Sequence, residues 1–401
     1  MASNANFEIS FAPATGKDLS LREKVGVLVM AAKLVAALPF LAIRAFFSGR
    51  CKSGKSWVYE LRSRILYFAL SRLHPRQINL VNPPSAIRIK AVSKELKVPV
   101  TVDEVEGGGK VHWWGERKGR KVFYHIHGGG YNLGIGLHHL LWLHRTQELL
   151  KTRGVEADFA ILEYSLTPTA RYPTQMNQAV EGLRLLIEKY NYDPANIILS
   201  GDSAGGALVL SVASHILHPH PSGSIKPLIL PESSPKLGGL IAMSPWTSFA
   251  TDYNSMQNPT GKDVVFPYFV KIWSRWLVDR PDEPRHQSLP PLPLTGGQKY
   301  TWDEYNQAGQ ADPSWWTGFP VKKSIVLIGD DETMRDSIVD FGQKFREGVE
   351  KGEGVVDIVL CEGEIHTECL YDTPVAKVQK VPGKMAEAIW AFSEEVLKTV
   401  E

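Results

Sequence analysis

From about residue 90 onward, short apolar runs alternate with longer segments of helical character. The short runs are typical of strands buried in a sheet, and the longer segments are typical of helices that cover it. This alternation predicts an α/β fold with a mostly parallel eight-stranded sheet and helices on both faces. We predict strands at 98–106, 110–115, 121–127, 158–164, 196–200, 238–244, 324–329 and 355–361, and helices at 138–152, 175–190, 204–217, 337–352 and 383–400.

The N-terminal part begins with a different pattern. Residues 25–47 are apolar except for Lys33 and Arg44, and Pro39 lies inside the run. The run is long enough to span a bilayer. However, Arg22, Lys33 and Arg44 recur every 11 residues, about three helical turns, so they share one face of a helix. A cationic stripe on an apolar helix favours a helix that covers a hydrophobic pocket or lies on a membrane surface over one that spans the membrane.

A second amphipathic helix is expected over residues 57–73, where apolar residues alternate with arginines at helical spacing. We therefore predict an N-terminal helical cap over residues 1–90, and an α/β catalytic domain over 91–401 that carries a cap insertion, rich in Pro and Trp, at 247–319. For residues 25–47, the alternatives to a cap helix are an anchor on the membrane surface and a spanning anchor.

The turn between two of the expected elements reads Gly201-Asp202-Ser203-Ala204-Gly205-Gly206. A serine between small residues, after a strand and before a helix, is typical of a nucleophile elbow, which exposes the serine oxygen. The helix that starts at Ala204 directs its free N–H groups toward the position where an oxyanion forms. The pattern therefore predicts Ser203 as a nucleophile, although a plain strand–turn–helix corner has the same local sequence.

A glycine tract follows the third expected strand and reads His127-Gly128-Gly129-Gly130. Glycines allow backbone N–H groups to approach a substrate oxygen closely, as an oxyanion hole requires. By itself such a tract is a flexible loop, but together with the serine elbow it predicts oxyanion donors at these glycines and at Ala204. We expect His127 to brace the loop by hydrogen bonding.

A serine nucleophile of this kind needs an acid and then a histidine farther along the chain. After residue 286 the sequence contains a single histidine, His366, directly after the last expected strand. We therefore predict that His366 is the general base. The acid is expected after the preceding strand, where the candidates are Asp330, Asp331, Glu332 and Asp336.

Charge and composition narrow the functional class. The chain of 401 residues has a net charge of +2, which makes no general case for nucleic-acid binding. Residues 17–76 are an exception, with twelve Lys and Arg against three acids, an excess of nine positive charges. Three cysteines without C-x-x-C spacing exclude a disulfide framework and a zinc ribbon, and we expect no cofactor or metal. A cytoplasmic location is expected, with contact between residues 22–47 and an intracellular membrane as an open possibility.

Together these motifs resemble the hormone-sensitive-lipase-type branch of the α/β-hydrolases, and fungal members in particular. The glycine tract and the serine elbow match the two hallmarks of that branch, and three further segments are similar to it: Tyr164-Ser165-Leu166-Thr167-Pro168, Ser244-Pro245-Trp246 and Glu332-Thr333-Met334-Arg335-Asp336. The last segment stands where the family has Asp-Pro-Leu-Arg-Asp. The resemblance therefore implies Glu332 as the triad acid, in place of the usual aspartate, with Asp331 as its rival.

The resemblance implies a serine hydrolase that cleaves a carboxylic ester through an acyl-enzyme. Ser203, Glu332 and His366 would form the triad, and Gly128, Gly129, Gly130 and Ala204 the oxyanion hole. The expected substrate carries a short acyl group on a bulky hydrophobic alcohol or biosynthetic intermediate. Two alternatives are acyl transfer or cyclisation on the same triad, and a non-hydrolytic small-molecule-binding protein. The presence of His366 argues against the binding protein, because such proteins can lose the catalytic histidine.

Overall fold

The structure is a computed structural model. The expected cap (1–90) and insertion (247–319) are described only in part, because residues 1–18, 48–56 and 279–301 lie outside the described residues. Pro168, in one of the family-like segments, also lies outside them. The described residues are 19–47, 57–70, 72–73, 77–78, 82–167, 169–278, 302–371 and 382–398.

An eight-stranded sheet forms the centre of the molecule, in the order β1-β2-β4-β3-β5-β6-β7-β8. The strand β2 is antiparallel to both of its neighbours, and all other pairs are parallel. The α/β fold and the mostly parallel eight-stranded sheet are thus confirmed. The strands are β1 (Val100–Glu104), β2 (Lys110–Trp114), β3 (Val122–Ile126), β4 (Asp158–Glu163), β5 (Ile197–Asp202), β6 (Leu237–Met243), β7 (Val321–Gly329) and β8 (Val355–Cys361).

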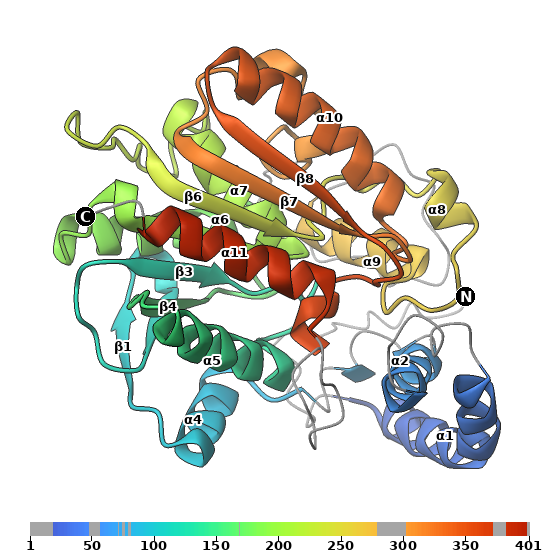
Figure 1. Ribbon diagram of the computed structural model, residues 1–401. Coiled ribbons are helices and arrows are strands. Elements are labelled where there is room, and N and C mark those ends of the chain that lie inside the picture. The colour runs from blue at the N-terminus through green and yellow to red at the C-terminus, as the bar shows by residue number, and fades with distance from the viewer. Residues whose placement is uncertain are drawn as a thin grey trace, which may run out of the picture.

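Helices cover both faces of the sheet (Figure 1). One face packs against α5 (Leu137–Thr152) and α11 (Lys384–Lys398), whose Leu140 and Ile389 belong to one core cluster. A second core cluster includes residues of α6 (Thr174–Arg184), α7 (Ala204–Leu217) and α10 (Arg335–Lys351). Strands β3, β5 and β6 are buried along their whole length, as expected for parallel strands covered on both sides.

Some elements differ from the expectations. The predicted helix over 175–190 is α6, and it ends in a π-helical turn, Leu185–Lys189. Among the described residues, the α-helices α4 (Ser85–Leu96), α8 (Asn254–Gln257) and α9 (Pro267–Leu277) were not predicted. The expected boundary at residue 90 falls inside α4, which packs against α5. The apolar pattern of α4 is short, with only Ile89 and Val92 as its buried large apolar residues.

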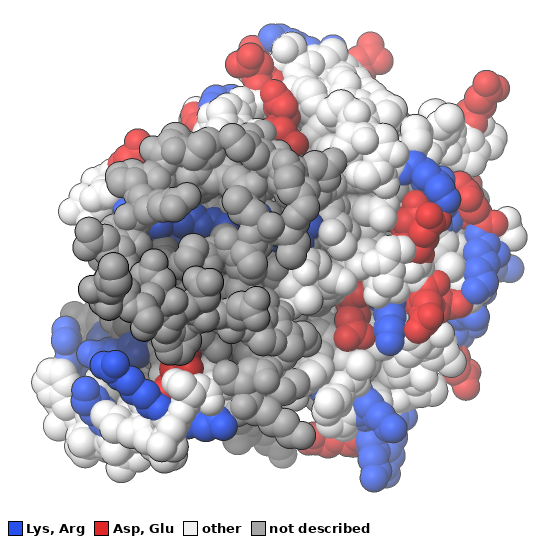
Figure 2. All heavy atoms as spheres, turned by 180° about the vertical axis from the view of Figure 1, so that it is seen from behind, with Lys and Arg blue, Asp and Glu red and all other residues white. Residues whose placement is uncertain are grey.

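The N-terminal helix α1 (Leu21–Phe46) packs against α2 (Trp57–Leu70), beside the α/β body (Figure 1). Ser20 caps α1, and the carboxylate of Glu23 completes a capping box. The helix is long and apolar enough to cross a membrane. Figure 2 shows Lys and Arg side chains among uncharged ones over these two helices.

The two sides of α1 differ. Val27 and Met30 pack against the core, and Ala45 is fully buried. The opposite side exposes Arg22, Lys33 and Arg44 to solvent. It also exposes nine large apolar side chains, if the adjoining Phe47 is included: Leu21, Val25, Leu28, Val29, Val35, Phe40, Ile43, Phe46 and Phe47.

Helix α2 lies closer to the body than α1 does. The Tyr67 ring lies 5.0 Å from that of Phe266, which precedes α9. Arg62 donates from Nη1 to the carbonyl of Tyr371 at 2.8 Å, and its guanidinium lies over the Tyr371 ring. Tyr371 ends the 3-10 turn that follows His366. Helix α2 therefore contacts both α9 and the segment after the predicted base.

Candidate active site

Ser203 lies between the end of β5 and the start of α7. Its φ of 53° and ψ of −118° lie outside the regions that L-residues favour, which is the strained turn expected of a nucleophile elbow. The turn is fixed from two sides, because Ser203 N–H donates to the carbonyl of Met243 at 2.8 Å and its own carbonyl accepts from Trp246 at 2.9 Å. The predicted helix start at Ala204 is confirmed.

The glycine loop lies directly against this elbow. Gly128 N–H donates to Oδ1 of Asp202 at 3.0 Å. A Cβ added to Gly128 would lie 2.3 Å from the Asp202 carboxylate and 2.9 Å from the Ser203 Cβ, so only glycine fits there. The structure thus brings together the glycine tract and the serine, which are about 70 residues apart in the sequence.

The other end of the glycine loop contacts α9. Gly130 has a φ of 60°, and a Cβ there would lie 2.1 Å from the indole ring of Trp273. Trp273 in turn stacks on Phe269, with ring centroids 4.9 Å apart. The loop is therefore held between the serine elbow and an aromatic surface that comes from the 247–319 segment.

Buried histidines support the loop from behind. His139 and His125 lie 3.2 and 3.4 Å from the Asp202 carboxylate. Although burial favours the neutral acid, these histidines hold the pKa of Asp202 well below its usual range. His127 contacts the Gly128 carbonyl through Nδ1 at 2.8 Å and stacks on Tyr164. Burial lowers the pKa of His127 to about 4, which agrees with a neutral bracing side chain.

His366 and Glu332 form a buried pair. His366 lies in the loop after β8 and Glu332 in the loop after β7, and the distance from Nδ1 to Oε2 is 3.0 Å. Burial alone would lower the pKa of His366, but the hydrogen bond and charge of Glu332 outweigh it, so this pKa is raised. Burial raises the pKa of Glu332, and its bond to His366 offsets that effect only in part.

The other three candidate acids have cationic partners. Asp331 pairs with Lys262 Nζ at 2.8 Å, while Asp330 and Asp336 pair with Arg335 at 3.6 and 2.9 Å. Of the four carboxylates, Glu332 is therefore the one in contact with the imidazole of His366.

The Ser-Pro-Trp segment after β6 joins the elbow to the histidine loop. Ser244 has a φ of 42°, and its Oγ accepts from the N–H of Thr367 at 3.0 Å. Two residues on, Trp246 donates to Ser203, as described above. The sequence identified this segment only by resemblance, whereas the structure shows that it positions two parts of the site.

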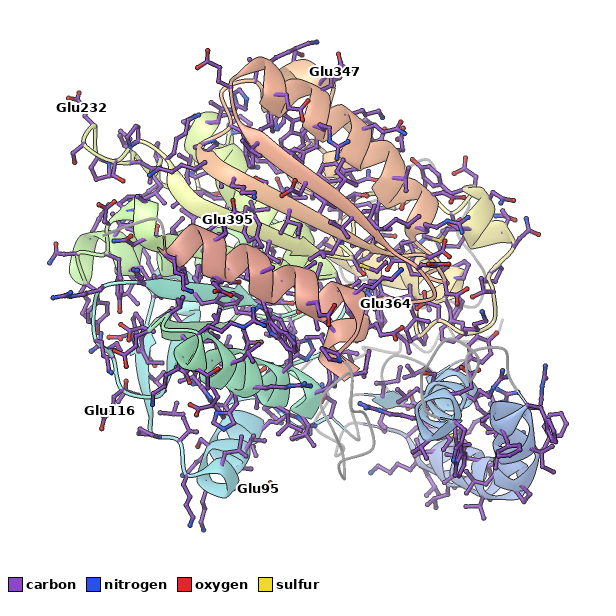
Figure 3. The ribbon with its side chains drawn as sticks, viewed as in Figure 1. Glu95, Glu116, Glu232, Glu347, Glu364 and Glu395 are labelled. Atoms are coloured by element: carbon purple, nitrogen blue, oxygen red, sulfur yellow. The ribbon has the colours of Figure 1, made fainter. Side chains whose placement is uncertain are left out.

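The loop after β8 is anchored on its other side by Glu364, which Figure 3 labels. Its carboxylate accepts from the N–H of Met385 at the start of α11, and its carbonyl accepts from Asp331 N–H at 2.8 Å. In the part of the chain that the structure describes, no group of three or more His, Cys, Asp and Glu side chains is arranged to hold a metal ion.

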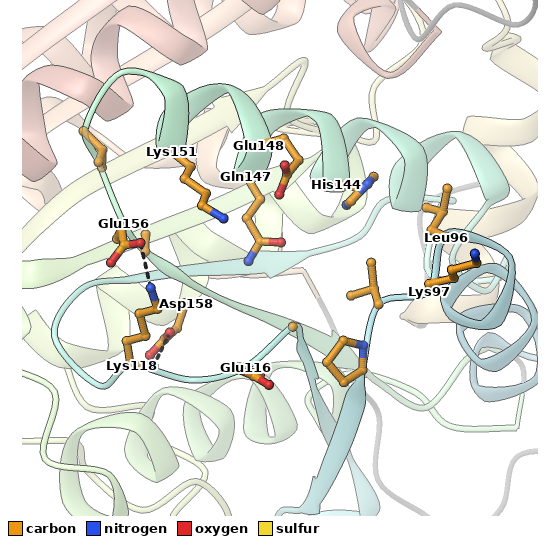
Figure 4. A pocket seen from close by; sticks show the side chains of 15 residues that line it. Leu96, Lys97, Glu116, Lys118, His144, Gln147, Glu148, Lys151, Glu156 and Asp158 are labelled. Atoms are coloured by element: carbon orange, nitrogen blue, oxygen red, sulfur yellow. Dashed lines mark hydrogen bonds and ion pairs between the residues drawn. The ribbon is translucent and has the colours of Figure 1, made fainter.

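A separate hollow of about 450 Å³ lies between the end of α4, β2 and α5 (Figure 4). At one end of it Lys118 pairs with Glu156 at 2.6 Å, and the backbone N–H of Lys118 donates to Asp158. None of the predicted site residues lines this hollow. The hollow is therefore distinct from the candidate active site.

Known proteins similar to this chain include esterases and deacetylases. Arylacetamide deacetylase of Mus musculus is 31% identical over 103 residues, which cover 24% of this chain and 25% of the relative. The alignment thus spans about a quarter of that relative's length. A putative steryl acetyl hydrolase, mug81, of Schizosaccharomyces pombe is 25% identical over 237 residues, covering 57% of this chain and 55% of the relative.

A solved structure of a bacterial esterase from the hormone-sensitive lipase family has the same fold, with a TM-score of 0.53 and 19% identity over 92% of this chain and 99% of the other. This agrees with the resemblance noted from the sequence. A model of the family described as alpha/beta hydrolase fold matches residues 123–370, more than half of the chain and all of the predicted site residues. The chain therefore belongs to the α/β-hydrolase fold family.

Proposed function

We propose that this protein hydrolyses carboxylic esters through an acyl-enzyme formed on Ser203. The main support for the proposal is the buried pair of Glu332 and His366, whose side chains are 3.0 Å apart. This pair lies at the carboxyl ends of the parallel strands, where the strained Ser203 elbow and the glycine loop also lie. Relatives named as deacetylases and acetyl hydrolases support the same reaction class.

In the proposed reaction, Ser203 Oγ attacks the ester carbonyl and transfers its proton to Nε2 of His366. The bond from Nδ1 to Glu332 leaves Nε2 for this exchange and stabilises the imidazolium that forms. The N–H groups of the glycine loop (128–130) and of Ala204 stabilise the oxyanion. The alcohol leaves with the proton from His366, and a water molecule, activated by the same imidazole, then hydrolyses the acyl-enzyme.

The proposed substrate is a short acyl ester of a bulky hydrophobic alcohol. Two of the relatives are named for the removal of acetyl groups, one from an arylacetamide and the other from a steryl ester. In this chain, Trp273 lies against Gly130 of the glycine loop and stacks on Phe269. Phe266 and Tyr67 continue this aromatic cluster. Aromatic rings at that position favour a large apolar alcohol.

A series of p-nitrophenyl esters tests the proposed function. We expect turnover to be highest for acetate or butyrate and to fall for chains of about ten carbons or more, because the small acyl group and the large alcohol occupy different sides of the site. Adding an acceptor alcohol separates hydrolysis from acyl transfer, since a transferase forms the new ester faster than the free acid. Failure to cleave any ester in the series would contradict the proposal.

We also propose that α1 attaches the protein to a membrane surface. Its exposed side combines apolar side chains with the cations Arg22, Lys33 and Arg44, which is the pattern of a helix that lies in the lipid interface. The excess of nine positive charges over residues 17–76 adds attraction to anionic lipids. The inner side of α1 is occupied by packing on α2 and the core.

Substituting acidic residues on this exposed side tests the attachment. The double variant Leu28→Glu/Phe40→Glu should lose co-sedimentation with anionic phospholipid vesicles, because the two side chains are 69% and 60% exposed and their apolar contact with lipid would be lost. Hydrolysis of p-nitrophenyl acetate should stay within about twofold, as is usual for surface changes. The matched control is Ile229→Glu, at a side chain that is 83% exposed on the α/β body.

Three outcomes would contradict surface attachment. One is that the unaltered protein stays in the supernatant with vesicles. Another is that it is released from membranes only by detergent and not by alkaline carbonate, which indicates a spanning helix. The third is that deleting residues 1–50 impairs turnover of bulky esters more than that of p-nitrophenyl acetate without changing vesicle binding, which is the result expected of a cap helix.

A further inference from the structure

A buried carboxylate outside the expected triad lies between the two loops that carry Glu332 and His366. Asp263 belongs to the segment between β6 and β7, and only 1% of it is exposed. Its Oδ1 accepts from the backbone N–H of His366 at 3.0 Å, and its Oδ2 accepts from that of Thr333 at 2.7 Å. Oδ1 also accepts from the N–H of Val264 at 2.8 Å. One carboxylate is thus bonded to the base's own backbone and to the residue next to the acid.

The residues beside this carboxylate attach the same segment to the acid loop. Lys262 pairs with the side chain of Asp331 at 2.8 Å, and Thr260 Oγ1 donates to the Asp331 carbonyl at 3.0 Å. On the other side, Thr333 Oγ1 donates to the carbonyl of Val265 at 3.0 Å. The segment over 260–265 therefore follows the acid loop closely, and Asp263 is the point at which it also reaches the histidine loop.

Asp263 acts on His366 through charge as well as through hydrogen bonds. The charges of three acidic side chains act on the His366 imidazole: Glu332, Asp263 and Asp202. All three raise the pKa of His366 against the effect of burial, and Glu332 contributes most. A buried carboxylate is costly unless donors satisfy it, and here three backbone N–H groups do so. Keeping such a group beside the imidazole favours the imidazolium that forms when the serine loses its proton.

We propose that Asp263 is a positioning residue that fixes the histidine loop against the acid loop and stabilises the imidazolium of His366. This proposal rests on the function proposed above, because it assigns Asp263 a role in the reaction of Ser203 and His366. It also gives the insertion between β6 and β7 a part in assembling the catalytic pair.

The variant Asp263→Asn tests the proposal. It keeps the size of the side chain but removes the charge and turns one acceptor oxygen into an NH₂ group that faces a backbone N–H. We expect kcat to fall by about 10- to 100-fold, with KM changed by less than about threefold, because the loss concerns the transition state. The acid limb of the kcat/KM profile should move to lower pH, since the His366 pKa is no longer raised by this charge.

The control variant is Thr260→Val, which removes a hydrogen bond between the same segment and the acid loop without changing charge. It should stay within about twofold in kcat and leave the acid limb in place. The pKa of His366 is also measured by NMR titration of its imidazole protons. The NMR measurement does not need turnover, so it separates the two proposals. If the unaltered protein cleaves no ester but the pKa of His366 is lower in Asp263→Asn, only the proposed function is contradicted.

The proposal would be overturned if Asp263→Asn kept kcat within about twofold and left the pKa of His366 unchanged. It would also be overturned if Thr260→Val lowered kcat as much as Asp263→Asn does. If Asp263→Asn does not fold, Asp263→Glu takes its place. That variant keeps the charge but displaces it by one methylene, so it should keep the acid limb near its original pH while kcat falls. An unchanged kcat in Asp263→Glu, or a limb that moves to lower pH, would also overturn the proposal.

Discussion

Replacing Ser203 with alanine should lower kcat for p-nitrophenyl esters by about 10⁴-fold or more, while the protein remains folded. The expectation follows from the strained turn of Ser203, which places its Cβ beside Gly128 of the glycine loop. The melting temperature should change little, because the side chain loses only one oxygen. Backbone strain should not be relieved, because alanine has the same backbone preferences as serine.

Circular dichroism and thermal unfolding provide the folding control for this variant. The matched comparison is Ser200→Ala. This variant removes a buried serine hydroxyl from β5, the strand that ends just before Ser203, where the hydroxyl lies 3.3 Å from the His125 ring nitrogen. We expect Ser200→Ala to lower kcat by less than about tenfold. A folded Ser203→Ala variant that keeps full turnover would contradict the acyl-enzyme mechanism.

Replacing Glu332 with glutamine should lower kcat by on the order of 10² to 10⁴, a smaller loss than for Ser203, because the serine and imidazole remain. Removing the charge also removes the main cause that raises the pKa of His366. The base acts in its neutral form, so kcat/KM rises with pH through this pKa. The acid limb should therefore move to lower pH, as stopped assays between about pH 4 and 9 would show.

Asp331→Asn is the control for this prediction, since Asp331 is the rival acid and pairs with Lys262. It should reduce kcat by less than about tenfold. If Asp331→Asn costs more than Glu332→Gln, the alignment with the family's acid segment is shifted by one residue and Asp331 orients His366.

The sheet could be predicted because parallel strands covered on both faces form short, continuous apolar runs. The run at 355–361 and the helix at 204–217 have the predicted bounds. Helix α8 was missed because a single turn of four residues is too short to show a helical period. Helix α9 has buried residues at helical spacing, at Phe269, Trp273 and Trp276, so its pattern was recognisable, but the proline at its start is also typical of a loop.

The site was predictable where chemistry imposes a local pattern, as at Ser203 and the glycine tract. The choice of Glu332 among four neighbouring carboxylates rested on the family resemblance alone, because a shift of one residue decides which side chain reaches the imidazole. Asp263 gave no signal at all in the sequence. Two of its three backbone donors are 70 and 103 residues away, and contacts of that kind leave no motif.

The central claim is that Ser203 is a nucleophile activated by His366. It is tested most directly by covalent labelling with a fluorophosphonate, followed by mass spectrometry of the peptide that contains the modified residue. We predict one adduct, on Ser203, that is absent from Ser203→Ala and forms far more slowly in His366→Ala. Absence of labelling in the folded protein, or an adduct on another residue, would contradict the account.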